Sequence, residues 1–188
     1  MARAQASAET YIGLVEVGVG VIPGGGGCKE LLARLKDPRK VFELIGFAKV
    51  ATSAEEAKKL GLLNRTDRIS MNPERLIGDA KDLALSLATD YVPGVPRTDI
   101  KVGGDSVLAM LKVGAWTAHQ GGYISDHDLL IANKLAHILS GGNLTGEQNV
   151  SEQYLLDLER EAFLSLCGHP KTQARMQHML KTGKPLRN

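Results

Sequence analysis

A run of four glycines, Gly24–Gly27, limits what the chain can form around it. Each glycine carries a large backbone-entropy cost and adds no side-chain packing, so the run is typical of an irregular turn where the backbone takes positive φ or another group comes close. The apolar residues Tyr11 to Val15 before it predict a strand, and Cys28 to Leu35 after it predict a helix. Glu16 falls between strand and turn, and the stretch therefore predicts a site-like arrangement of strand, carboxylate, glycine turn and helix N-terminus.

Two glycine-containing phosphate-binding motifs are excluded here. A dinucleotide fingerprint needs G-x-G-x-x-G after a strand, whereas Gly18 to Gly24 has one residue too many and contains a proline. A P-loop needs Gly-Lys followed by Ser or Thr, whereas Cys28 separates Gly27 from Lys29 and no hydroxyl follows.

The stretch from Val15 to Gly27 resembles the signature of the enoyl-CoA hydratase/isomerase (crotonase) family, Pro-Glu-x-x-x-Gly-x-Ile-Pro-Gly-x-Gly-Gly. Glu16 falls on the acidic position, and Gly20, the triplet Ile22-Pro23-Gly24 and the glycine pair are in register. Val15 stands where the family usually has proline, and Cys28 where it usually has Thr or Ser.

Two further segments are similar to the same family. Ala54 to Asn64 resembles its Ala-x-x-Ala-x-x-x-Gly-Leu-Val segment, and Ala162 to Pro185 resembles its closing helix pair. The whole chain resembles the C-terminal end of long bacterial β-oxidation proteins that fuse an NAD-dependent 3-hydroxyacyl-CoA dehydrogenase to a crotonase unit, most weakly from Tyr91 to Gly104. The resemblance implies a truncated crotonase-like α/β (α+β) fold, predominantly α-helical with a few strands near the N-terminus. Residues 1–71 would be the back part of a crotonase-like core, and residues 72–188 a helical C-terminal region.

The resemblance also implies the site. Glu16 would be the catalytic residue that exchanges a proton at the α-carbon of an enoyl-CoA, and Gly20, Val21, Pro23 and Gly24 would bind the substrate. A carboxyl in such a role needs an apolar pocket, where desolvation lifts its pKa toward the working pH. Taken alone, a glutamate at a strand end is more often a solvated edge residue, and the glycine turn serves equally as a tight crossover.

Two functions from different classes remain open from the sequence, beside a helical binding domain of unknown ligand. The first is enoyl-CoA hydration or double-bond isomerisation on acyl-CoA thioesters, and the second is a non-catalytic docking and oligomerisation module of the same parent. The start at Met1-Ala2-Arg3 has no turn or cap signal, which suits a chain cut inside a larger protein. In the family, the oxyanion donors and a second glutamate precede the Glu16 position, so the chain alone is expected to be inactive.

Helix start and stop signals recur along the rest of the chain. Tyr91 to Gly104 carries three prolines and predicts an extended linker, and Arg68 to Met71 predicts a short strand. The helices are predicted to begin at Asp37-Pro38, Ser53 (a capping box with Glu56), Asn72-Pro73 (with a buried stripe of Leu76, Ile77, Ala80, Leu83, Ala84 and Leu87), Asp105, Ser125 (with Asp128), Ser151 and Pro170. Gly61 is predicted to end the helix after Ser53, and Gly141-Gly142 the helix after Ser125. The helix after Ser125 is predicted to have an apolar seam of Leu129, Ala132, Leu135, Ala136 and Leu139.

Composition and charge limit the partners. The net charge of +2 favours no polyanion, and the aromatic share of 4% argues against a single-strand nucleic-acid platform. Cys28 and Cys167 match no metal spacing and indicate reduced thiols, and no apolar run predicts a membrane span or signal peptide. We therefore expect a cytoplasmic homo-oligomer that takes an acyl-CoA substrate, with no cofactor in this chain and NAD in the dehydrogenase part of the parent.

The histidines and the basic C-terminal end each have an ordinary structural interpretation. His119, His127 and His137 do not share a helix face, so surface or helix-end positions are favoured over metal ligation. A solvated face is favoured over contact with CoA phosphates for Lys171, Arg175, Lys181, Lys184 and Arg187.

Overall fold

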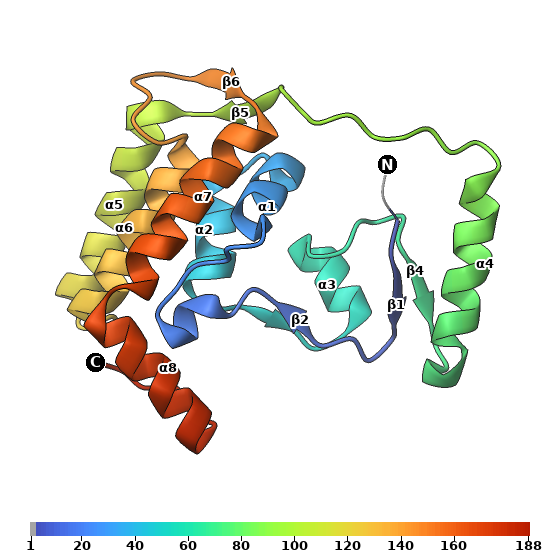
Figure 1. Cartoon of the computed structure of the whole chain (residues 1–188), viewed down its shortest axis with the longest axis horizontal. Coiled ribbons are helices and arrows are strands. Elements are labelled where there is room, and N and C mark those ends of the chain that lie inside the picture. Colours follow the sequence, from blue (N-terminus) through green and yellow to red (C-terminus); the bar gives the residue numbers. More distant parts are fainter. Residues whose placement is uncertain (1–2) are drawn as a thin grey trace. The chain divides into compact units, whose positions relative to one another are not determined.

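The computed structural model describes residues 3–188, which divide into two compact units. The first unit holds the described residues up to Gly13 together with Val50–Val95, and the second holds Leu14–Lys49 together with Pro96–Asn188 (Figure 1). Each unit is thus built from two separate segments of the chain. The predicted division after residue 71 is of a different kind, because it assigns residues 1–71 to a crotonase-like core and residues 72–188 to a helical region. It stays a prediction.

The first unit contains short strands and two helices. Its elements are β1 (Gln5–Ser7), β2 (Ile12–Gly13), β3 (Val50–Ala51), α3 (Ala54–Leu60), β4 (Arg68–Ser70), the 3-10 helix η2 (Pro73–Arg75) and α4 (Leu76–Ala88). β1 pairs with β4 in parallel, with Gln5 opposite Arg68, and β2 pairs with β3 in antiparallel fashion. The short strand predicted from Arg68 to Met71 is confirmed as β4, which ends at Ser70.

The cap of α3 differs in one bond from the prediction. Ser53 accepts from the Glu56 backbone N–H at 3.1 Å, as a capping box requires. The Glu56 carboxylate, however, accepts from the backbone N–H and the hydroxyl of Thr52 at 2.7 and 2.8 Å, one residue before the cap. The helix still ends at Gly61 in the left-handed conformation, as predicted.

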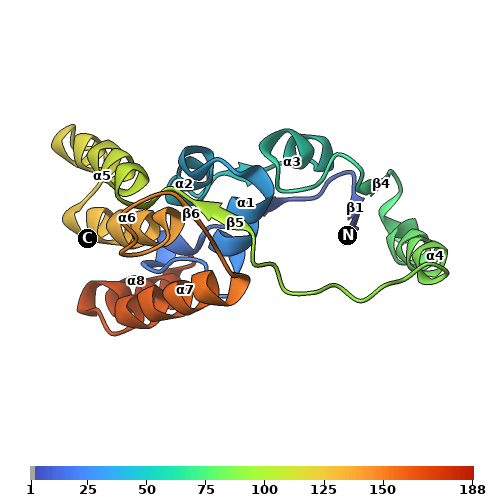
Figure 2. The same cartoon turned by 90° about the horizontal axis from the view of Figure 1, so that it is seen from above.

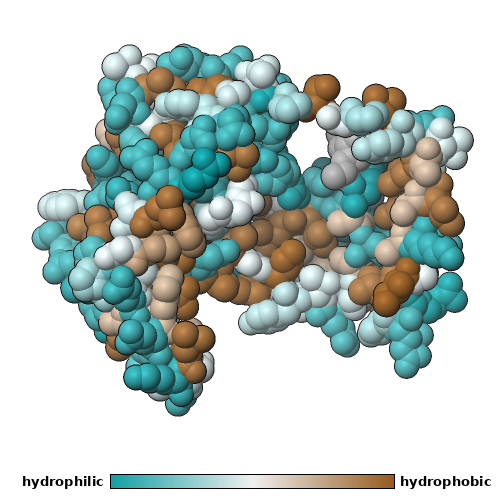
Figure 3. Space-filling view, in the orientation of Figure 1, coloured by the Kyte–Doolittle hydropathy of each residue, from teal (hydrophilic) through white to brown (hydrophobic). Residues whose placement is uncertain are grey.

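The apolar stripe predicted for α4 is not buried within its unit. Leu83 is its one buried residue, while Ile77 is 84% exposed. Leu85 and Leu87 are exposed as well, and hydrophobic side chains are visible on the surface over α4 (Figure 3). The helix itself is present, so the prediction is right about the element and wrong about its burial.

The second unit is mainly helical. Its elements are η1 (Glu16–Val19), α1 (Gly27–Leu35), α2 (Pro38–Gly46), β5 (Ile100–Val102), α5 (Gly104–Gln120), α6 (Asp126–Ser140), β6 (Gln148–Val150), α7 (Glu152–Cys167) and α8 (Pro170–Thr182). β5 pairs with β6 in antiparallel fashion, so the predicted linker from Tyr91 to Gly104 contains a strand. The strands are therefore not confined to the N-terminal part of the chain.

Helix α6 lies at the centre of this unit and contacts α1, α2, α5 and α7 (Figure 2). Its N-terminus has the complete predicted capping box between Ser125 and Asp128. The predicted seam is confirmed at Leu135, Ala136 and Leu139, each fully buried, whereas Leu129 and Ala132 are half-buried. These apolar side chains are removed from water on a helix with four neighbours and form the main core of the unit.

Candidate functional site

Glu16 is the first residue of the four-residue 3-10 helix η1. The strand predicted before it, from Tyr11 to Val15, is limited to Ile12–Gly13, so the carboxylate does not lie at a strand end. The turn ends at Gly20, whose φ of +92° lies in the left-handed region. Glycine is suited to that conformation because a Cβ would be strained there.

The Glu16 carboxylate is held partly out of water. The residue is half-buried, and its Oε2 atom is buried with no hydrogen-bond partner within residues 3–188. Burial, followed by the charges of Glu159 and Glu16, raises the pKa of the Cys28 thiol well above its ordinary value. Cys28 therefore stays protonated and is no thiolate nucleophile.

The four residues predicted to bind substrate differ in exposure. Gly20, Val21 and Pro23 are buried, and Gly24 is exposed. A Cβ added at Gly24 would come within 2.7 Å of the Phe163 ring, so the backbone here packs closely on α7. Their role in substrate binding, and that of Glu16 in catalysis, stay predictions.

The glycine turn is closed by a carboxylate from α7. The fully buried Glu159 accepts from the Gly26 N–H at 2.7 Å and from the Lys29 N–H at 3.2 Å. Burial raises the pKa of Glu159, and these backbone hydrogen bonds oppose the rise. A charged side chain of the protein thus occupies the N-terminus of α1, where an anion is favoured by the free N–H groups and the helix dipole.

Glu159 was not predicted, although the sequence contains a signal. It follows Leu155 by four residues and precedes Ala162 by three, so it falls on the buried face of α7. A charged residue at an apolar position of a helix indicates a partner, because an unpaired buried charge is costly. The sequence does not identify that partner, since Glu159 lies 133 residues from Gly26 and 130 residues from Lys29.

A buried polar chain connects α6 and α8 to the end of η1. The Thr172 hydroxyl donates to the Gly20 carbonyl oxygen at 2.8 Å, and His127 Nε2 lies 2.8 Å from the same hydroxyl. The His127 ring stacks on His169 with centroids 4.5 Å apart. Burial, then the charges of Arg175, His169 and Lys171, lowers the pKa of His127 to about 4. The surface position favoured for this histidine is wrong, although it does lie in the first turn of α6.

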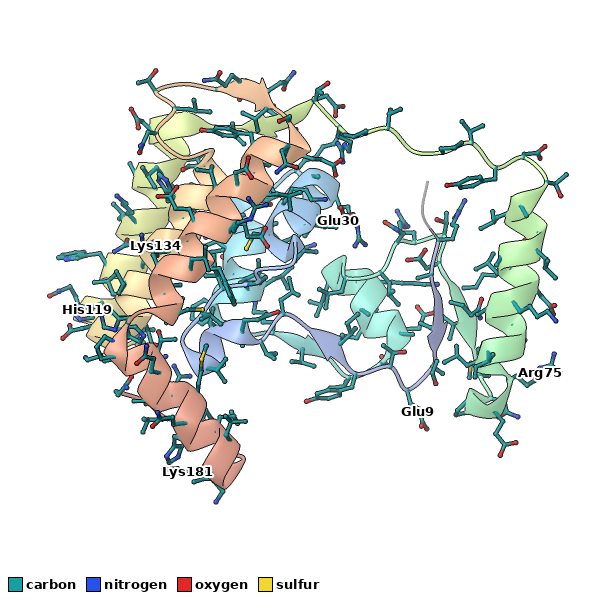
Figure 4. All side chains as sticks on the ribbon, viewed as in Figure 1. Glu9, Glu30, Arg75, His119, Lys134 and Lys181 are labelled. Atoms are coloured by element: carbon teal, nitrogen blue, oxygen red, sulfur yellow. The ribbon has the colours of Figure 1, made fainter. Side chains whose placement is uncertain are left out.

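Arg175 is also buried, so the predicted solvated face is wrong for this residue. Its Nη1 atom lies 2.7 Å from Asp128 Oδ1 and 3.5 Å from the Val17 carbonyl oxygen, and its Nε donates to Asn188 Oδ1 at 2.8 Å. The other predicted basic residues, Lys171, Lys181, Lys184 and Arg187, are exposed, as seen for Lys181 on α8 in Figure 4. Arg175 therefore joins η1, α6, α8 and the last residue.

A mainly apolar cavity of about 170 Å³ adjoins η1. Val17 and Gly18 of η1 line it together with Phe42 on α2 and small residues of α5, and Asp128 and Arg187 are polar residues of its lining. An apolar space of this size is enough for a short hydrocarbon group.

Residues 3–188 contain neither a metal-binding cluster nor a candidate membrane span. No three His, Cys, Asp or Glu side chains converge in a way that would hold a metal ion. No helix in this part of the chain has the length and apolar character needed to cross a membrane.

The sequence is similar to enzymes of fatty-acid oxidation. Its full length matches 25% of a probable 3-hydroxyacyl-CoA dehydrogenase of Bacillus subtilis, with 53% identical residues. In the same way, 94% of the chain matches 22% of a putative fatty acid oxidation complex trifunctional enzyme of Rickettsia felis, with 28% identical residues. The chain therefore spans about a quarter of the length of these relatives. No family model matches the sequence.

A shorter relative is matched over most of its own length. A short-chain-enoyl-CoA hydratase of Clostridioides difficile is 40% identical over 110 residues, which are 53% of this chain and 67% of the hydratase. Through that match, which covers about half of its residues, the chain belongs to the enoyl-CoA hydratase family.

Proposed function

We propose that this chain is the C-terminal crotonase-type part of a longer cytoplasmic β-oxidation protein, and that it acts on acyl-CoA thioesters by enoyl-CoA hydration or double-bond isomerisation. On this proposal, the dehydrogenase part of the parent uses NAD, and the parent is a homo-oligomer. The family match and the two longer relatives support the pathway, and the resemblance of residues 15–27 to the crotonase signature supports the fold.

The observation that carries the catalytic proposal is the environment of Glu16. A carboxylate oxygen that is buried and has no partner within residues 3–188 is free to exchange a proton with a bound molecule. Glu16 would exchange that proton at the α-carbon of the enoyl thioester, while Gly20, Val21, Pro23 and Gly24 would form the neighbouring part of the substrate site. Of these four, Gly24 presents exposed backbone to solvent.

The cavity beside η1 supports an acyl substrate. It is apolar and begins at Val17 and Gly18, the two residues that follow Glu16. Glu16 itself is not among the lining residues, so the cavity supports the proposal only through the turn that they share. A mainly apolar cavity suits the hydrocarbon part of an acyl thioester better than a polar substrate.

The test is Glu16→Gln in the complete gene product, because this change keeps the shape of the side chain and removes its titratable proton. We expect hydration of crotonyl-CoA to fall about 100- to 10,000-fold, with dehydrogenase activity retained. Glu30→Gln, at an exposed position of α1, is the matched control and should leave both activities unchanged. The chain on its own is expected to show background rates, because the oxyanion donors of the crotonase pattern precede Glu16.

A second candidate is a docking and oligomerisation module without catalysis. The observation that favours it is the exposed apolar surface of the first unit, which includes Ile77 at 84% and Val92 at 80% exposure. The same experiment separates the two proposals. Unchanged hydratase and isomerase rates in the Glu16→Gln protein would exclude the catalytic role and favour docking.

A further inference from the structure

The turn that carries Glu16 is short and has little support of its own. η1 spans Glu16–Val19, and its N-cap residue Val15 makes no side-chain cap. At its start, Gly18 N–H donates to the Val15 oxygen at 2.9 Å. The bonds that close its end are longer, from Gly20 N–H to the Val17 oxygen at 3.2 Å and from Val21 N–H to the Glu16 oxygen at 3.3 Å. Because 3.2–3.3 Å is at the long end for N–H···O bonds, the end of the turn at Gly20 is where contacts from other elements add most support.

Helix α8 supplies those contacts. The Thr172 hydroxyl donates to the Gly20 carbonyl oxygen at 2.8 Å, and Arg175 Nη1 lies 3.5 Å from the Val17 carbonyl oxygen. A Cβ added at Gly20 would lie 3.0 Å from both the Cα and the Oγ1 of Thr172, so α8 and the turn are in direct contact. Thr172 is itself fully buried.

The direction of the hydrogen bonds is set by the threonine. A hydroxyl has one proton, and Thr172 gives it to the Gly20 carbonyl oxygen, so the 2.8 Å contact with His127 requires Nε2–H of the histidine to donate. His127 Nδ1 then carries no proton, in agreement with its burial without a partner among residues 3–188. Burial and the nearby Arg175 lower the pKa of His127 to about 4, which keeps the ring neutral at physiological pH. The tautomer follows from the Thr172 hydrogen bond alone.

We propose that His127 and Thr172 are a positioning pair that fixes the Gly20 carbonyl and, through η1, the place of the Glu16 carboxylate. Neither residue touches the substrate in this proposal, which rests on the proposed role of Glu16. His127 orients the hydroxyl, the hydroxyl holds the end of the turn, and the turn presents the carboxylate. Such positioning affects the rate because a misplacement of about 1 Å costs on the order of 100-fold.

The test uses Thr172→Val in the complete gene product, since valine keeps the branched shape and removes the hydroxyl. We expect faster hydrogen exchange of the Gly18, Gly20 and Val21 amides, a kcat for enoyl-CoA hydration lower by about 10- to 100-fold, and an almost unchanged KM. Thr172→Ser keeps a hydroxyl and should restore both readouts. Thr182→Val is the matched control, because that exposed hydroxyl on α8 bonds only to backbone within or just after the helix.

A milder second variant, His127→Leu, leaves the Thr172–Gly20 bond in place and removes the donor that orients it, so we expect intermediate values of exchange and kcat. Unchanged amide hydrogen exchange in the turn of the Thr172→Val protein would overturn the proposal. If Glu16→Gln abolishes hydration, faster amide exchange in the Thr172→Val protein with an unchanged kcat would overturn it as well. If Glu16→Gln itself leaves hydration unchanged, the proposed function fails, and the positioning role fails with it.

Discussion

Helices α6 and α4 both have an apolar stripe at helical spacing, yet they differ in burial. On α6, Leu135 and Leu139 are fully buried, whereas on α4 Leu83 is buried and Ile77 and Leu87 are exposed. The stripe predicts that a helix forms and which face is apolar. Burial also needs neighbouring elements that cover the apolar face. Helix α6 has four such neighbours in its own unit, whereas α4 contacts β1 and η2 and buries only Leu83.

The largest effect should separate these two helices. Leu135→Ala is expected to lower the free energy of unfolding by about 3–5 kcal/mol, because it leaves a cavity in a core where the side chain is fully buried. The corresponding change Ile77→Ala on the α4 stripe, where the side chain is 84% exposed, should cost less than about 0.5 kcal/mol. Urea unfolding measures both, and equal costs would show that α4 has a partner that covers it.

A buried charge gives the next largest effect within the second unit. Glu159→Ala is expected to lower the free energy of unfolding by about 3 kcal/mol, because the Gly26 and Lys29 amides lose their acceptor. Glu159→Gln keeps one acceptor oxygen and should cost less. Glu161→Ala, at an exposed position of the same helix, is the control, and a cost as large as that of Glu159→Ala would contradict the capping role.

The smallest predicted effect depends on pH. The native state holds the pKa of His127 at about 4 against the ordinary 6.5, so between these values the unfolded chain binds a proton that the native chain does not. Stability therefore falls as the pH is lowered, by about 2 kcal/mol between pH 7 and pH 5. In His127→Leu the fall measured by urea unfolding should be much smaller, with a remainder from His137, whose pKa is lowered by burial. A full-sized fall in that variant would exclude His127 as its source.

The sequence predicted local structure well where the signal is local. Asp37 with Pro38, Ser125 with Asp128, and the glycines after α3 and α6 lie at helix boundaries because each acts on backbone within a few residues. The prediction of a mostly helical chain is confirmed as well, because most of the helices have capping or stop residues that can be recognised from the local sequence.

What could not be predicted depends on contacts between distant residues. Glu159 and Gly26 are 133 residues apart, and Thr172 and Gly20 are 152 apart, so no local pattern pairs them. The strand expected from Tyr11 to Val15 is limited to Ile12–Gly13, because its partner strand Val50–Ala51 pairs with only those two residues and lies far away in the sequence. Glu16 was singled out through a motif, while the residues that support it carry no motif.

The interleaved order of the two units has a consequence for synthesis on the ribosome. The start of α1 leaves the ribosome long before α7, because Glu159 follows Gly26 by 133 residues. At about 5–20 residues per second, that interval is roughly 7–27 s, during which the amides of the glycine turn have only water or transient partners. The turn that carries Glu16 waits still longer for Thr172. The second unit therefore reaches its native arrangement only when its last two helices have been made, and a nascent chain that stalls before residue 159 is expected to expose this turn to proteases.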